Sequence, residues 1–220
     1  MIQDFSHCQH DTERKVFEFL EQALPKTTDI VVYPNIELYD TSKASYVECD
    51  AIVVTRSFIA VVELKDWFGS ITVQEPKWRR GGSLIDSPHI VNNRKCKVFK
   101  SYVQHVLSGV AEHKLPFVQS VVALTNTNAH VDGASSARHA NVNDGLITLD
   151  GIEELAQYLK RRLNSQEQHE RVLNDYQFRR LVEQLNKDKQ SVSISYEDQI
   201  PGYRIKEDRG STLNYITYIA

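Results

Sequence analysis

Cysteine is scarce in this sequence. The 220 residues include three, Cys8, Cys49 and Cys96, and none stands in a CxxC pair or beside a histidine at zinc-finger spacing. Widely spaced thiols in odd number argue against a disulfide framework and for a reducing compartment. Apolar runs are also short, FIAVV at 58–62 being among the longest, and the N-terminus has no basic start followed by an apolar stretch. These absences predict a soluble, cytoplasmic protein without a membrane partner.

Neither sign of charge dominates the composition. The chain carries 26 Lys and Arg residues against 29 Asp and Glu, a net charge of −3, so no global excess points to a nucleic acid or a membrane. The motifs of serine hydrolases (GxSxG) and of P-loop enzymes (the Walker lysine) are missing, and the eight histidines do not cluster. Because 41% of the residues are hydrophobic, the chain can bury one substantial core.

Hydrophobic periodicity predicts alternating helices and strands. One amphipathic stripe, made of Val98, Tyr102, Val106 and Val110, predicts a helix over 92–110. The polar stretch 126–144 lacks periodicity and predicts an exposed loop. The other helices are expected at 11–24 and 151–163, and strands at 29–38, 48–54, 58–65, 117–125 and 145–150. This order predicts an α/β sandwich in which helices flank a central mixed sheet.

The character of the chain changes after residue 165. We expect a first domain over 1–165, a charged helical connector over 166–190, and a β-rich tail over 191–220. The tail pattern stops at Ala220 without partner helices, which predicts a C-terminal fused domain beyond it.

A charged triplet ends the most apolar strand. Strand 58–65 finishes in Glu63-Leu64-Lys65, and alternation places Glu63 and Lys65 on the same face. If a turn of two or four residues precedes this strand, the numbers of paired residues sum to 113, and Asp50 lies opposite Glu63. A loop of odd length would instead send Asp50 to the other face.

Two opposed carboxylates suit a metal ion. Their Cβ atoms would lie about 4.5–5.5 Å apart, close enough to share one hard cation such as Mg²⁺ or Mn²⁺. Lys65 could then orient the attacking water or offset charge that develops in the reaction. The plainer alternative is an ordinary salt bridge at a strand end, because an ExK triplet also occurs by chance.

The longer motif resembles a known family. The stretch ECDAIVVTRSFIAVVELKDWFGSI at 48–71, followed by Trp78, is similar to the NERD (nuclease-related) domain, a branch of the PD-(D/E)xK nuclease superfamily. That family reads D-x-strand, turn, strand, E-x-K, then an aromatic residue and a glycine such as Trp67 and Gly69. The resemblance covers roughly 10–125. It implies a restriction-endonuclease-like fold and a Mg²⁺- or Mn²⁺-dependent endonuclease that hydrolyses phosphodiester bonds, with DNA the favoured substrate.

The resemblance also implies individual roles. Asp50 and Glu63 would bind the metal, the Leu64 carbonyl would be a further ligand, and Lys65 would be the catalytic lysine. Glu13 matches an acidic residue that the family carries before its first strand, where it helps to hold metal or water. Its alternative is a solvated charge on a helix face.

A basic cluster follows the motif. Residues 77–100 contain seven cations and one acid, Asp86, which makes this stretch +6. The resemblance puts a glutamine or lysine of the next helix near the active site, with Lys95 or Lys97 as stand-in, but both are predicted rather as phosphate contacts. Trp67 and Trp78 could stack on bases or pack against the sheet. The predicted nucleic-acid contacts are Arg79, Arg80, Arg94, Lys95, Lys97 and Lys100, a solvated face being the alternative.

Other functions stay open at this point. IPGYRIKEDRGSTLNYITYIA at 200–220 resembles the first strands of a kinase-like lobe, although Gly210 stands alone where such a loop carries several glycines. A non-catalytic nucleic-acid-binding module, or a regulatory domain fused to a kinase-like partner, are the rival functions. Symmetric cutting of a duplex would favour a homodimer. The sequence does not separate DNA from RNA.

Overall fold

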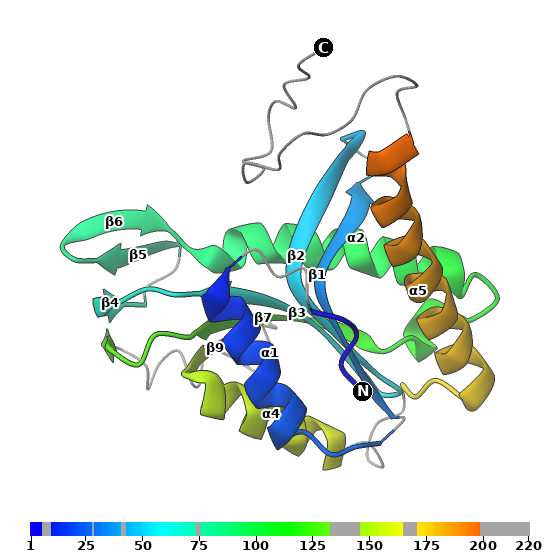
Figure 1. Ribbon diagram of the computed structural model, residues 1–220, viewed down its shortest axis with the longest axis horizontal. Helices are drawn as coiled ribbons and strands as arrows, with labels where there is room; N and C mark the ends of the chain where they lie inside the picture. The colour runs from blue at the N-terminus through cyan, green and yellow to red at the C-terminus, as the bar shows by residue number, and fades with distance from the viewer. Residues whose placement is uncertain are drawn as a thin grey trace.

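A central mixed sheet carries helices on both of its faces (Figure 1). The structure is a computed structural model, and it describes residues 1–5, 10–27, 29–40, 43–73, 76–132, 146–164 and 171–198. The sheet has the order β1-β2-β3-β7-β9, in which β1, β2 and β3 are antiparallel neighbours and β3, β7 and β9 run parallel. Its strands are β1 (Ile30–Asp40), β2 (Ser45–Thr55), β3 (Phe58–Lys65), β7 (Phe117–Leu124) and β9 (Leu146–Asp150). The predicted α/β sandwich is confirmed.

Two hydrophobic cores lie on opposite faces of this sheet. Helices α1 (Asp11–Ala23) and α4 (Ile152–Asn164) cover one face, and α2 (Pro88–Val106) and α5 (Asp175–Asp198) cover the other (Figure 1). Strand β3 lies between the two cores and is buried from Phe58 to Leu64. A strand covered on both faces must be apolar throughout, which explains why a polar ending to β3 stands out in the sequence.

A smaller, four-stranded sheet follows β3. It has the order β6-β5-β4-β8 and packs through Ile71 and the fully buried Trp78 against Val122 and Leu124 of β7. Its strands are four residues long, too short for a periodic pattern to reveal. They are β4 (Gly69–Thr72), β5 (Lys77–Arg80), β6 (Ser83–Asp86) and β8 (Ala129–Asp132), and a 3-10 helix spans Glu112–Lys114. The loop predicted over 126–144 is therefore wrong at its start, where β8 pairs with β4, and 133–144 lie outside the described residues.

Helix α2 differs from its prediction in position and face. It begins at Pro88, where Ser87 caps the N-terminus by accepting a hydrogen bond from the His89 N–H, and it ends at Val106. The buried stripe runs through Phe99 and Val103 rather than through Val98 and Tyr102. The prediction chose the wrong face because the buried face also carries polar residues, which a search for hydrophobic periodicity does not count.

The C-terminal region is helical for longer than expected. Helix α5 continues to Asp198, so residues 191–198, predicted as strand, are helical. A helix already formed adds further residues cooperatively, which outweighs the strand preference of a short β-branched stretch. The remainder of the predicted tail, 199–220, lies outside the described residues, as does Cys8. Cys49 and Cys96 are free and buried. Among the described helices, none is both long and apolar enough to cross a bilayer.

Candidate functional site

The β2–β3 hairpin has the register that the sequence predicted. The side-chain oxygen of Thr55 accepts a hydrogen bond from the Phe58 N–H at 3.0 Å and donates to the Phe58 carbonyl at 2.8 Å, which closes a turn at 56–57. The ladder runs from Val54↔Ile59 to Ala51↔Val62. The paired residue numbers sum to 113, as predicted, so Asp50 follows directly at the end of this ladder.

Beyond that ladder, β2 and β3 separate at Asp50. At that point a side chain is the hydrogen-bond acceptor: the Asp50 Oδ2 atom accepts a hydrogen bond from the Leu64 N–H at 2.7 Å. On the other side of β2, pairing with β1 is interrupted at Asn35, which has a left-handed φ of 43°. The alternation of faces shifts at this irregularity, since Cys49 packs in the core below α2 whereas Ala51 packs in the core below α1.

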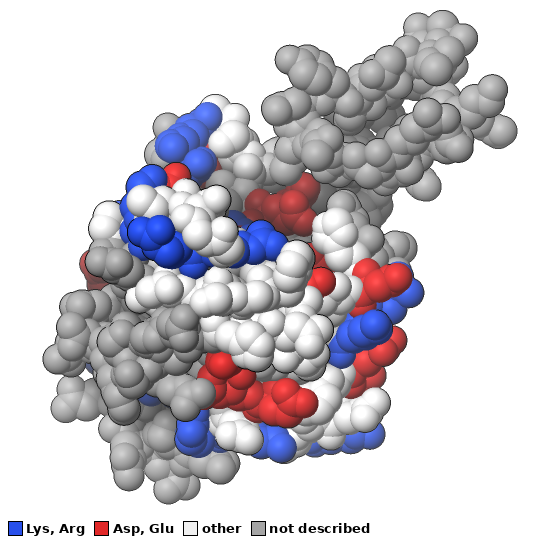
Figure 2. Space-filling view, turned by 90° about the vertical axis from the view of Figure 1, so that its left-hand side faces the viewer, with Lys and Arg blue, Asp and Glu red and all other residues white. Residues whose placement is uncertain are grey.

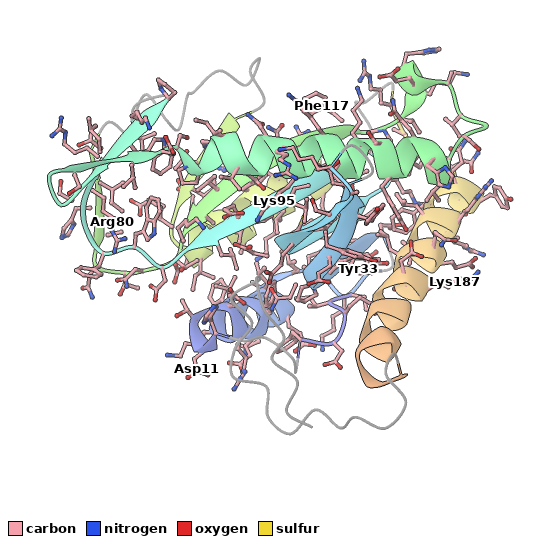
Figure 3. All side chains as sticks on the ribbon, turned by 90° about the horizontal axis from the view of Figure 1, so that it is seen from above. Asp11, Tyr33, Arg80, Lys95, Phe117 and Lys187 are labelled. Atoms are coloured by element: carbon pink, nitrogen blue, oxygen red, sulfur yellow. The ribbon has the colours of Figure 1, made fainter. Side chains whose placement is uncertain are left out.

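We call the point where β2 and β3 separate the fork. Two lysines contact the carboxylates of Asp50 and Glu63 there. Glu63 is 5% exposed, and its two carboxylate oxygens contact Lys65 Nζ at 2.6 Å and Lys95 Nζ at 2.5 Å. Lys95 Nζ also lies 3.5 Å from Asp50 Oδ1. Figure 3 shows Lys95 between α2 and the sheet, in the middle of the molecule. The formal charges of these four side chains sum to zero.

Buried hydrogen bonds hold α2 in the position that delivers Lys95. The Asn92 side-chain amide donates to the Val61 carbonyl at 2.8 Å and to the Val121 carbonyl at 3.1 Å, so one side chain joins the helix to β3 and β7. His89 Nε2 lies 2.9 Å from the Thr148 hydroxyl on β9. Asn92 precedes Lys95 by three residues, which puts both on the same face of the helix.

The two carboxyl groups differ in acidity. Burial raises the pKa of Asp50, and the nearby charge of Glu63 raises it further. Burial also acts to raise the pKa of Glu63, but the ammonium groups of Lys95 and Lys65 outweigh burial and leave this pKa below its ordinary value. Burial works against the charge of Lys95, yet Asp50 and Glu63 raise its pKa overall. The same surroundings therefore shift the pKa values of the two carboxyl groups in opposite directions.

A cavity of about 450 Å³ opens beside the fork. Asp50, Leu64 and Lys65 line it from the sheet, and Glu13 lines it from α1. Glu13 Oε2 accepts a hydrogen bond from the Asn35 amide at 3.2 Å, and burial, followed by the charge of Asp50, raises the pKa of Glu13. The structure thus brings Glu13, Asp50 and Lys65 to one cavity, while Glu63 and Lys95 lie buried behind its wall.

The basic stretch 77–100 does not form one continuous cationic surface. Four of its seven cations are paired with acids: Lys77 with Asp86, Arg94 with Asp40, Lys95 with Glu63 and Asp50, and Lys100 with Glu112. Lys95, predicted as a phosphate contact, is 8% exposed and belongs to the buried cluster. Lys97 is exposed on α2, and Arg79 and Arg80 lie on β5, in the small sheet at one end of the molecule (Figure 3). Figure 2, which faces that end, shows Lys and Arg gathered over its upper part.

Some contributors to the site carry no recognisable sequence signal. Asn35 and Asn92 hold the site only through contacts between distant segments. Trp78 is fully buried against Trp67 and His89, so it packs the small sheet and is not available to stack on a base. In the described part of the chain, no three His, Cys, Asp or Glu side chains gather closely enough to hold a metal ion by themselves.

Comparison with known proteins adds a family match. The family model described as "Nuclease-related domain" matches residues 9–125, which is more than half of the 220 residues. The matched segment contains Glu13, Asp50, Glu63, Lys65 and Lys95. No curated protein and no solved structure matches the chain.

Proposed function

Because the chain belongs to the family of nuclease-related domains, we propose that it hydrolyses phosphodiester bonds of nucleic acid, DNA in the first place, with Mg²⁺ or Mn²⁺ as cofactor. One observation carries this proposal. Asp50 and Lys65 line one cavity at the point where β2 and β3 separate, and Glu63 lies directly behind them in contact with Lys65. The cavity therefore offers a carboxylate and a flexible cation side by side.

The donor atoms fit a hard divalent cation. Mg²⁺ is usually held by one or two carboxylates, and water and phosphate oxygens complete its shell. Asp50 and Glu63 supply two carboxylates, and a single cationic group, Lys95 Nζ, already lies within 4 Å of both. The Leu64 carbonyl is the third ligand in this proposal. When bound, the metal would polarise a phosphate oxygen and lower the pKa of a water molecule.

The chain's own residues supply the other requirements of hydrolysis. Lys65 is partly exposed in the cavity, where its ammonium can orient a water or offset charge on the phosphate. Glu13 lines the cavity and has a raised pKa, which makes its carboxylate a stronger proton acceptor than an ordinary glutamate. Lys95 is buried and keeps Glu63 ionised.

Cleavage assays with matched variants test this function. Plasmid and single-stranded DNA would be incubated with the protein in Mg²⁺, in Mn²⁺ and in EDTA. We expect metal-dependent cutting that falls at least about 100-fold in Glu63→Gln and Lys65→Met. Lys187→Met removes an exposed lysine from α5, outside the predicted nucleic-acid contacts, and should cut like the wild type. Thermal unfolding of each variant would show whether it is folded.

A second function, nucleic-acid binding without cleavage, is favoured by one feature of the site. Both carboxylate oxygens of Glu63 are already held by lysines, so the four charges balance without a metal. If the wild type shifts DNA in a gel but cuts nothing with any metal, and Lys65→Met binds equally well, the binding module replaces the enzyme as the function.

A further inference from the structure

An exposed aromatic side chain stands beside the candidate site. Phe68 follows Lys65 by three residues, and its side chain is 64% exposed. Three residues of extended chain span at most about 11 Å, so the backbone of Phe68 lies within that distance of the backbone of Lys65, which lines the cavity. This large aromatic group is not part of either core, so its ring is available to a ligand.

The segment that carries Phe68 is fixed at both ends. Before it, the carboxylate of Asp66 accepts hydrogen bonds from Thr12 at 3.0 Å and from Asn126 at 2.8 Å. After it, Gly69 adopts a φ of +83°, a conformation that favours glycine, and its N–H donates to the Asn128 carbonyl at 3.1 Å. Phe68 is therefore presented by an anchored turn, and the entropy cost of ordering it on binding is small.

A cation lies against the same ring. The Arg80 guanidinium is 5.4 Å from the centroid of Phe68 and 5.3 Å from that of Trp67. Arg80 thus joins an exposed aromatic ring, a half-buried one and a positive charge in a single surface. We name the group of Trp67, Phe68 and Arg80 the aromatic platform.

Because the walls of the cavity are acidic, a polyanion needs a cationic surface outside the cavity in order to bind. Four acids line the cavity, namely Glu13, Glu48, Asp50 and Asp66, against one lysine. Phosphates are repelled by this wall until a cation offsets it, so most of the affinity for a strand must arise outside the cavity. Two residues of the aromatic platform, Trp67 and Phe68, directly follow Asp66 of the cavity wall.

We propose that the aromatic platform binds an unpaired base, which makes a single strand, or a strand separated from its complement, the substrate of the neighbouring site. In a duplex, the faces of each base are covered by the bases stacked above and below it. An exposed ring gains stacking energy only when a base is free, and Arg80 can contact the phosphate beside that base. This inference rests on the proposed function, because it assumes a nucleic-acid substrate.

Phe68→Ala and Leu84→Ala form a matched pair of variants for the test. Leu84 lies on β6 of the small sheet, which begins at the residue after Phe68, and is 63% exposed, so its removal takes away a similar exposed apolar group that is not aromatic. Affinities for a fluorescent oligo(dT) strand and for a blunt DNA hairpin would be measured by anisotropy in EDTA, which prevents metal-dependent cutting. Phe68→Tyr keeps the ring and should restore binding.

Tryptophan fluorescence gives an independent reading. Trp78 is fully buried, so a change in emission on adding oligo(dT) reports on Trp67 in the platform. We expect Phe68→Ala to lose about tenfold in affinity for the single strand, with less than about twofold change for the hairpin. Leu84→Ala and Phe68→Tyr should match the wild type for both, and oligo(dT) should quench Trp67.

The outcomes separate this inference from the proposed function. If the wild type cuts DNA but Phe68→Ala binds the single strand as the wild type does, the platform is refuted and the nuclease stands. Equal losses in Phe68→Ala and Leu84→Ala, or equal losses on single strand and hairpin, also refute base stacking. A wild type that binds neither probe and cuts neither substrate refutes both.

Discussion

The two sheets of this protein differ in how deeply their lysine–carboxylate ion pairs are buried. At the end of β3 in the five-stranded sheet, Lys95 and Glu63 form an ion pair whose side chains are 10% and 6% exposed. In the four-stranded sheet, Lys77 and Asp86 form a pair whose side chains are 56% and 68% exposed. The chemical groups are alike, a lysine and a carboxylate, but their surroundings differ in how much water they admit.

This contrast explains why the two regions suit different tasks. A buried charge that loses its partner keeps the full cost of leaving water, so the first pair must hold its geometry. An exposed pair is worth less than about 1 kcal/mol, and its members can turn to another partner. In the proposed function, the five-stranded sheet would therefore place the reacting groups, and Arg79 and Arg80 of the four-stranded sheet would contact the ligand.

Removing one lysine from each pair gives the largest expected difference. We expect Lys95→Met to lower the free energy of unfolding by about 3–5 kcal/mol, because Asp50 and Glu63 are left buried without their shared cation. Lys77→Met should change it by less than about 0.5 kcal/mol. Urea denaturation in EDTA measures both.

Added metal makes this comparison sharper. Mn²⁺ should restore part of the stability of Lys95→Met, because a divalent cation can take the place of the ammonium between two carboxylates. It should leave Lys77→Met unchanged. Equal stability of the two variants in EDTA would contradict the difference between the sheets.

A pair of asparagines extends the comparison to uncharged groups. Asn92 donates three buried hydrogen bonds that join α2 to the sheet, whereas Asn126 binds Asp66 at the exposed edge of the small sheet. Replacing Asn92 by Ala removes these buried hydrogen bonds between α2 and the sheet, and we expect a loss of about 1–3 kcal/mol in the free energy of unfolding. Asn126→Ala should cost less than half as much, and a similar loss for both would show that burial is not the deciding factor.

The success of the sequence-based prediction also differs between the two sheets. The register of β2 and β3 follows from a short turn and a long apolar strand, so the approach of Asp50 and Glu63 could be derived from local information. Asn92 could not, and Lys95 was named only through the family resemblance, since the burial of both depends on where α2 lies on the sheet. The strands of the small sheet were missed because four residues do not establish a period.

The two carboxylates of the site should affect stability in opposite directions. The pKa of Glu63 is lowered, so its contribution is present above the ordinary glutamate pKa of 4.5 and is lost as the pH falls through its value in the folded protein. The pKa of Asp50 is raised, so stability falls as the pH rises from the ordinary aspartate pKa of 3.8 through the raised value, and the loss is complete above it.

Conservative variants at neutral pH separate these effects. In EDTA at pH 7, we expect Asp50→Asn to raise the free energy of unfolding and Glu63→Gln to lower it, each by less than Lys95→Met does. As the pH falls below the ordinary glutamate pKa of 4.5 and through the lowered pKa of Glu63, the difference between Glu63→Gln and the wild type should shrink. Changes of the same sign at pH 7 would mean that the lysines do not favour Glu63 over Asp50.

The smallest expected effect lies in the small sheet and concerns binding alone. Arg79 and Arg80 make no ion pair with an acid among the described residues, unlike Lys77 beside them on β5. We expect Arg79→Ala and Arg80→Ala each to reduce the slope of log K against log salt by about 0.7 for oligo(dT), because binding then neutralises one phosphate fewer and releases fewer counterions. Unfolding free energies should change by less than about 0.5 kcal/mol.

Lys77→Ala is the control, since its ammonium is already neutralised by Asp86. If all three variants reduced the slope equally, pairing with an acid would not decide which cations meet the phosphates, and the strand would instead be drawn by the summed charge of β5.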